Sequence, residues 1–145
     1  MSTPTARLAR RVHFSSGHRY FTDKLSEEEN KKVFGACYSP FGHGHNYILE
    51  AYFDGPIDPV TGMVINLIEV DQILKQVTDP LDHHHLNHDI PYFKNRVPTC
   101  ENIAQYLYQE VQKKVVGKSI SLFKVRLYES EDLWADVGAS PGINT

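Results

Sequence analysis

The 145-residue chain contains only two cysteines, Cys37 and Cys100, which are too few for a disulfide scaffold. No apolar run approaches the roughly 18–20 residues of a membrane-spanning helix, and the first residues lack the apolar stretch of a secretory signal. The formal net charge of −3 offers no overall attraction to nucleic acid or to an anionic membrane. We therefore expect a cytoplasmic protein whose partners include neither nucleic acid nor a membrane.

The chain also lacks internal repeats, low-complexity segments and the glycine-rich fingerprint of a dinucleotide-binding fold. Its length is typical of one domain, and a hydrophobic content of 41% is enough to form a core. We expect a single domain over residues 1–145, in which residues 1–6 form a loose terminus.

Hydrophobic periodicity divides the chain into strands and helices. Alternation of apolar and polar residues predicts strands over residues 8–18, 44–53, 63–65, 122–129 and 133–137. Helical spacing predicts helices capped by Asn66 and Thr99, and a shorter helix over 25–35. Residues 81–88 are expected to form a histidine-rich loop. The order of these elements indicates an α+β fold, an antiparallel sheet with two helices on one face.

Two of the eight histidines, His43 and His45, are separated by one glycine at the start of a predicted strand. Residues at i and i+2 share one face of a strand, about 6.5–7 Å apart, so both imidazoles can converge on one ion. His18 would add a third imidazole if the two strands are neighbours. Three histidines with an open fourth position are typical of a catalytic zinc site. Alternatively, the His-x-His pattern is only a polar strand end and His18 is unrelated.

Cys37 lies six residues before His43, in a segment that contains Pro40 and Gly42. A nearby zinc ion would lower the pKa of the thiol and populate the thiolate. The thiolate would then serve as a nucleophile, a general base or a fourth metal ligand. An ordinary semi-buried thiol is the alternative.

Asp82 directly precedes His83, and a carboxylate beside a histidine can fix its tautomer and support proton transfer. The neighbouring His84, His85 and His88 leave two alternatives open, a second metal site or a group of solvent-exposed histidines. A cysteine-protease arrangement is disfavoured, because the sequence typical of the protease cysteine is absent.

Glu129 is in register with Val125 and Leu127, so it is expected on the face that those apolar residues occupy. A buried carboxylate is costly unless it is paired. It would accept charge-assisted hydrogen bonds from a ligand edge that carries two N–H groups. The alternative is that the strand ends there and Glu129 reaches water.

Segments spread over roughly residues 12–130 resemble, in the same order, the 6-pyruvoyl-tetrahydropterin synthase family. They include Phe14-Ser-Ser-Gly-His18-Arg19, residues 25–37, Pro40-Phe-Gly-His43-Gly-His45-Asn46-Tyr47, and residues 57–67, 80–83, 91–93, 99–102 and 128–129. The resemblance implies a tunnelling-type fold, a four-stranded antiparallel sheet with two helices on one face. It further implies that the sheets of three subunits close a barrel, and that two trimers form a homohexamer.

The resemblance also implies the reaction and the site. The substrate would be the small molecule 7,8-dihydroneopterin triphosphate, converted to 6-pyruvoyl-tetrahydropterin and triphosphate by a zinc-dependent lyase of tetrahydrobiopterin synthesis. The implied roles fall on the Zn²⁺ ligands His18, His43 and His45, the proton-transfer residues Cys37, Asp82 and His83, and the pterin-binding residues Glu129 and Thr99.

Two other functions are compatible with the same fold. One is a 6-carboxytetrahydropterin synthase of deazaguanine synthesis, in which the cysteine usually precedes His-x-His by a shorter loop. Here five residues separate Cys37 from His43, which favours the pyruvoyl product. The other is a non-catalytic zinc- or pterin-binding relative, which would have no need of a proton relay at Asp82 and His83.

Overall fold

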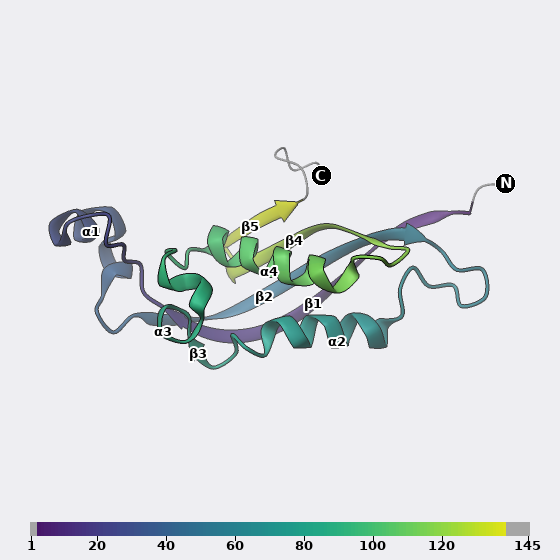
Figure 1. The fold of residues 1–145 in the computed structure, drawn as a ribbon, viewed down its shortest axis with the longest axis horizontal. Helices are drawn as coiled ribbons and strands as arrows, with labels where there is room; N and C mark the ends of the chain where they lie inside the picture. The colour runs from purple at the N-terminus through teal and green to yellow at the C-terminus, as the bar shows by residue number, and fades with distance from the viewer. Residues whose placement is uncertain (1–2, 139–145) are drawn as a thin grey trace.

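The computed structural model describes residues 3–138, which form a curved sheet covered by helices (Figure 1). In chain order the elements are β1 (Thr5–His18), α1 (Glu27–Phe34), η1 (Gly35–Tyr38), β2 (His43–Pro56), α2 (Leu67–Thr78), β3 (His84–His85), α3 (Leu86–Asp89), η2 (Pro91–Lys94), α4 (Cys100–Val115), β4 (Ser121–Ser130) and β5 (Leu133–Gly138). The sheet order is β3-β1-β2-β4-β5, and α2 and α4 lie on one face of it. The predicted α+β class is confirmed.

The sheet has five strands, so the expectation of four is corrected. The additional strand is β3, which lies inside the segment predicted to be a loop. Its two residues pair in parallel with Ser16 and Gly17 of β1. The predicted strand at 63–65 does not form. Instead, the N–H of Asp58 donates to the carbonyl oxygen of Met63 at 3.0 Å and closes a turn.

The N-terminus is more ordered than predicted. Thr5 pairs with Pro56 and Ala6 pairs with Gly55, so these two residues belong to β1 rather than to a loose terminus. The partner strand β2 runs three residues beyond its predicted end at Phe53, to Pro56. Its backbone groups therefore provide hydrogen-bond partners for the start of β1.

The helices begin where the sequence places their caps. The side chain of Asn66 accepts a hydrogen bond from the N–H of Ile68 at the start of α2. Thr99 accepts one from the N–H of Asn102 at the start of α4. Each cap satisfies a backbone donor that has no partner within the helix, which fixes the first turn.

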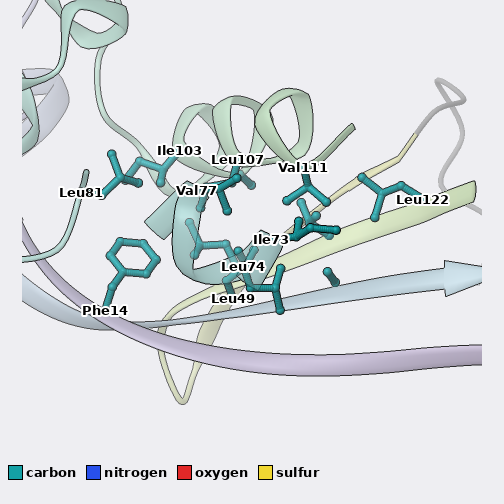
Figure 2. Close-up of a cluster of buried hydrophobic side chains, with 14 of the residues drawn as sticks. Phe14, Leu49, Ile73, Leu74, Val77, Leu81, Ile103, Leu107, Val111 and Leu122 are labelled. Carbon is teal, nitrogen blue, oxygen red and sulfur yellow. The ribbon is translucent and has the colours of Figure 1, made fainter. Parts of the chain in front are cut away.

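The hydrophobic core lies between the sheet and the two long helices (Figure 2). Side chains at alternate positions of the strands meet the apolar stripes of α2 and α4. The labelled members in the figure include Phe14, Leu49, Leu74, Ile103, Leu107 and Val111. This packing fixes the inner face of the strands that carry the histidines.

The other face of the sheet carries a row of alternating charges. Arg11 of β1 lies opposite Glu50 of β2, Glu50 opposite Arg126 of β4, and Arg126 opposite Asp136 of β5. Arg11 and Glu50 are joined at 2.5 Å, and Arg126 binds Asp136 through two hydrogen bonds of 2.7 and 2.9 Å. These side chains lie along the sheet, so that Glu50 is only 7% exposed.

Candidate metal and substrate site

Three histidines converge where β1 ends and β2 begins. The two strands are neighbours, with His18 opposite His43 and Ser16 opposite His45. One ring nitrogen from each of the three histidines lies within 4.8 Å of the others, so the group could hold a metal ion. The Nε2 atoms of His18 and His43 are 3.1 Å apart. Two nitrogens of a tetrahedral zinc site, each bonded at 2.0–2.1 Å, are separated by roughly 3.3 Å, so this spacing suits zinc.

The surroundings of His18 favour the form that binds a metal. Its Nδ1 lies 2.9 Å from the carbonyl oxygen of Pro98, which can only accept, so Nδ1 carries the proton and the lone pair remains on Nε2. The hydroxyl of Tyr47 lies 3.2 Å from the same Nδ1. Burial lowers the pKa of His18 to about 4, so the ring is neutral at physiological pH. Neutral imidazoles held by outer hydrogen bonds are what a zinc site requires.

Glu129, near the end of β4, faces the three histidines. Its Oε1 atom lies 3.6 Å from Nε2 of His18 and 3.6 Å from Nε2 of His45. The side chain is 10% exposed, so the predicted orientation toward the buried face is confirmed. This places a carboxylate beside the candidate metal position, where a ligand edge with two N–H groups could bind it.

Cys37 lies in η1, and the segment that follows β1 holds η1 in place. The N–H of Tyr20 donates to the carbonyl oxygen of Cys37 at 2.8 Å, and Nε of Arg19 donates to the carbonyl oxygen of Tyr38 at 2.9 Å. Burial raises the pKa of the Cys37 thiol, and the negative charge of Glu129 raises it further. In the metal-free protein Cys37 is therefore protonated at neutral pH.

Asp82 and His83 form the expected pair, with Nδ1 of His83 3.0 Å from Oδ2 of Asp82. The other carboxylate oxygen of Asp82 accepts the N–H of Ser15 at 2.8 Å, which lowers the pKa of Asp82. His83 is largely exposed and has a φ of 61°. His83 and His45 line the same open hollow, of about 410 Å³, where β1 ends and β2 begins.

Thr99 directly follows Pro98, whose carbonyl oxygen is hydrogen-bonded to His18. The fold therefore brings Thr99 close to the three histidines. Its own hydroxyl accepts the N–H of Asn102 and caps α4. Contact between Thr99 and a substrate stays a prediction. The adjacent Cys100 is buried, which raises its pKa to about 12, and its Sγ donates to the carbonyl oxygen of Leu127.

Comparison with known proteins identifies the relationship. The family described as 6-pyruvoyl tetrahydropterin synthase matches residues 7–140. The chain belongs to this family. The 6-pyruvoyl tetrahydrobiopterin synthase of Pongo abelii is 45% identical over 129 residues, which cover 88% of this chain and 87% of the relative.

A solved structure of a synthase and a relative of lower identity are also similar to this chain. The structure of 6-pyruvoyl tetrahydropterin synthase from Caenorhabditis elegans matches with a TM-score of 0.91 at 35% identity, and the match covers 97% of this chain and 100% of that one. A putative 6-carboxy-5,6,7,8-tetrahydropterin synthase of Archaeoglobus fulgidus is 32% identical over 66% of this chain and 74% of the relative. The described part of this family member contains no helix long and apolar enough to cross a membrane.

Three further residues contact the site and are not evident from motif reasoning. Tyr47 follows His43 and His45 at the same two-residue spacing, so strand alternation could have indicated it. Pro98 and Tyr20 carry no comparable signal, because they reach His18 and Glu129 only through the tertiary fold.

The other histidines do not form a second centre of the same kind. The rings of His85 and His88 lie 4.3 Å apart, in a partly stacked arrangement. Within residues 3–138 the group formed by His18, His43 and His45 is the only set of three or more converging potential ligands.

Proposed function

We propose that this protein is a zinc-dependent lyase that converts 7,8-dihydroneopterin triphosphate to 6-pyruvoyl-tetrahydropterin and triphosphate in tetrahydrobiopterin synthesis. The observation that carries the proposal is the convergence of His18, His43 and His45 beside the carboxylate of Glu129. Membership of the synthase family supports it. The two cysteines are free thiols, which supports a reducing, cytoplasmic location.

The three imidazoles would hold Zn²⁺ through one ring nitrogen each. When bound, zinc supplies Lewis-acid polarisation of the oxygens on the substrate side chain, which acidifies the neighbouring C–H and O–H bonds. Glu129 would accept hydrogen bonds from the N–H edge of the pterin, with the Thr99 segment beside it. Glu129 would thus fix the pterin ring while the metal held by the histidines fixes the side chain of the substrate.

Proton transfer is assigned to two groups on different segments. Cys37 would remove a proton from the substrate side chain. Its thiol is near Glu129, because the charge of that carboxylate raises the pKa of the thiol. His83 would return a proton, with Asp82 holding its Nδ1 at 3.0 Å. An internal oxidation of the side chain coupled to reduction of the ring needs no nicotinamide or flavin, and triphosphate leaves by elimination.

A 6-carboxytetrahydropterin synthase is the second candidate function, because it takes the same substrate on the same fold. The five residues between Cys37 and His43 favour the pyruvoyl product. The match to the putative carboxy enzyme also covers less of the chain than the match to the pyruvoyl enzymes.

We also propose that three copies close their sheets into a barrel and that two such trimers form a homohexamer. Within residues 3–138, β5 forms one edge of the sheet, and β3 covers only Ser16 and Gly17 of β1, so most of β1 lies along the other edge. Such unpaired edges favour pairing with another copy. The row of charges supports pairing of β1 of one copy with β5 of the next, since the row starts with Arg11 on β1 and ends with Asp136 on β5. Sedimentation of the purified protein is expected to give a hexamer, and a stable monomer would contradict this assembly.

The deciding experiment is product analysis after incubation with 7,8-dihydroneopterin triphosphate, with and without a zinc chelator. We expect release of triphosphate and a pyruvoyl-pterin product, both abolished by chelation and restored by added zinc. Release of acetaldehyde with a carboxy-pterin would assign the protein to the second function. Zinc binding without any turnover would leave a non-catalytic pterin- or zinc-binding protein.

A further inference from the structure

Tyr20 contacts three parts of the candidate site, namely Glu129, His18 and Cys37. Its hydroxyl lies 3.5 Å from Oε1 of Glu129, and its ring lies edge-on to the ring of His18 with centroids 4.9 Å apart. Its backbone N–H donates to the carbonyl oxygen of Cys37 at 2.8 Å.

The shortest contacts of Glu129 with Tyr20, His18 and His45 all involve Oε1. Oε1 receives the hydroxyl of Tyr20 and also lies 3.6 Å from Nε2 of His18 and of His45. The carboxylate can only accept, so the Tyr20 hydroxyl is the donor.

We propose that Tyr20 is a positioning residue of the pterin subsite, whose hydroxyl holds Oε1 of Glu129 beside the histidines and leaves Oε2 to accept the N–H edge of the ligand. The inference rests on the proposed function, because it takes Glu129 as the pterin anchor. The ring of Tyr20 packs against Phe34 at 5.7 Å between centroids, which fixes the direction of the hydroxyl. Orientation of an anchoring carboxylate should affect ligand affinity more than the chemical step.

The test is Tyr20→Phe, which removes the hydroxyl and keeps the ring. In zinc-loaded protein we expect the dissociation constant for neopterin, measured by its fluorescence, to rise about three- to ten-fold, the usual effect of one hydrogen bond. KM should rise by a similar factor while kcat stays within about two-fold of the wild-type value. Bound zinc, measured by metal analysis, should be unchanged. Tyr108→Phe is the matched control, since it removes the hydroxyl of a half-buried tyrosine on α4, with no expected effect.

A double-mutant cycle separates positioning from a general loss of structure. In a Glu129→Gln background, Tyr20→Phe should change neopterin affinity by less than about two-fold, because the carboxylate that it positions is gone. Equal affinity in wild type and Tyr20→Phe would overturn the role of Tyr20 and leave the proposed function standing. Loss of zinc in Tyr20→Phe would also overturn it, in favour of a structural role at His18. A wild-type protein that binds no pterin and turns over no substrate would refute the proposed function, and this inference with it.

Discussion

A β-carbon placed on Gly42 would lie 2.5 Å from the carbonyl oxygen of His18. Gly42 also has a φ of 70°, a conformation that other residues adopt only with strain. It directly precedes the candidate ligand His43, so any shift that relieves the clash moves that imidazole. Gly42→Ala is therefore expected to lower zinc affinity by at least about ten-fold, since a small displacement of a ligand disrupts tetrahedral geometry. Zinc titration of the purified variant measures this.

Gly62→Ala is the control for that substitution. Gly62 has a similar φ of 74°, but an added β-carbon would meet no atom within 4 Å. It should therefore lose about 1–2 kcal/mol of folding stability through backbone strain alone and keep its zinc affinity. Equal zinc affinity in Gly42→Ala and wild type would show that the close approach to His18 does not matter for the site.

Removal of one imidazole from the converging group should remove the metal. We expect His43→Ala to lose bound zinc and turnover together, because two remaining histidines form a far weaker site. His13→Ala is the matched control, since this exposed histidine of β1 lies outside the group and should leave the zinc content unchanged. Full activity of His43→Ala without metal would refute the zinc mechanism.

The reactivity of the Cys37 thiol is expected to depend on the charge of Glu129. Because that charge raises the pKa of the thiol, Glu129→Gln should lower the pKa and increase the thiolate fraction at neutral pH. In metal-free protein, alkylation of Cys37 by iodoacetamide at pH 7.5 is expected to become about two- to five-fold faster. Mass spectrometry distinguishes it from Cys100, whose pKa is about 12 and which should react far more slowly. Glu131→Gln, in the exposed turn before β5, should leave the rate unchanged.

The charge row on the outer face predicts a pH dependence of stability. Hydrogen bonds from Arg126 lower the pKa of Asp136 below its unfolded value of about 3.9. Its contribution is therefore present above that pH and is lost as the pH falls through the lower folded-state pKa. Asp136→Asn should reduce the free energy of unfolding by about 1–3 kcal/mol at pH 7, with the difference shrinking below about pH 4.

Denaturant unfolding at several pH values checks this prediction. Asp54→Asn is the control, because Asp54 forms a comparable bidentate pair with Arg7 but is more exposed. It should have a much smaller effect at every pH, since exposed ion pairs contribute little. A constant difference between wild type and Asp136→Asn down to pH 3 would argue against the pairing with Arg126.

The parts of this structure that were predictable from sequence depend on local patterns. The long strands, the caps at Asn66 and Thr99, and the shared face of His43 and His45 all follow from periodicity or from a single side chain. The two-residue strand β3 was not predictable, because two residues are too few to show a period. The carbonyl of Pro98 and the hydroxyl of Tyr20 were missed because they reach partners 80 and 109 residues away.

The pairing of β1 with β2 gives the candidate metal site a further property. The nitrogen of His18 meets those of His43 and His45 in only one alignment of the two strands. A slip of β1 by a single residue would turn His18 to the charged face while leaving every candidate ligand present in the chain. A metal ion bound to the three nitrogens would therefore stabilise the correctly aligned pair of strands over its slipped forms, by a free energy that grows with metal concentration. Metal loading would thus select one strand alignment during folding, before any substrate arrives.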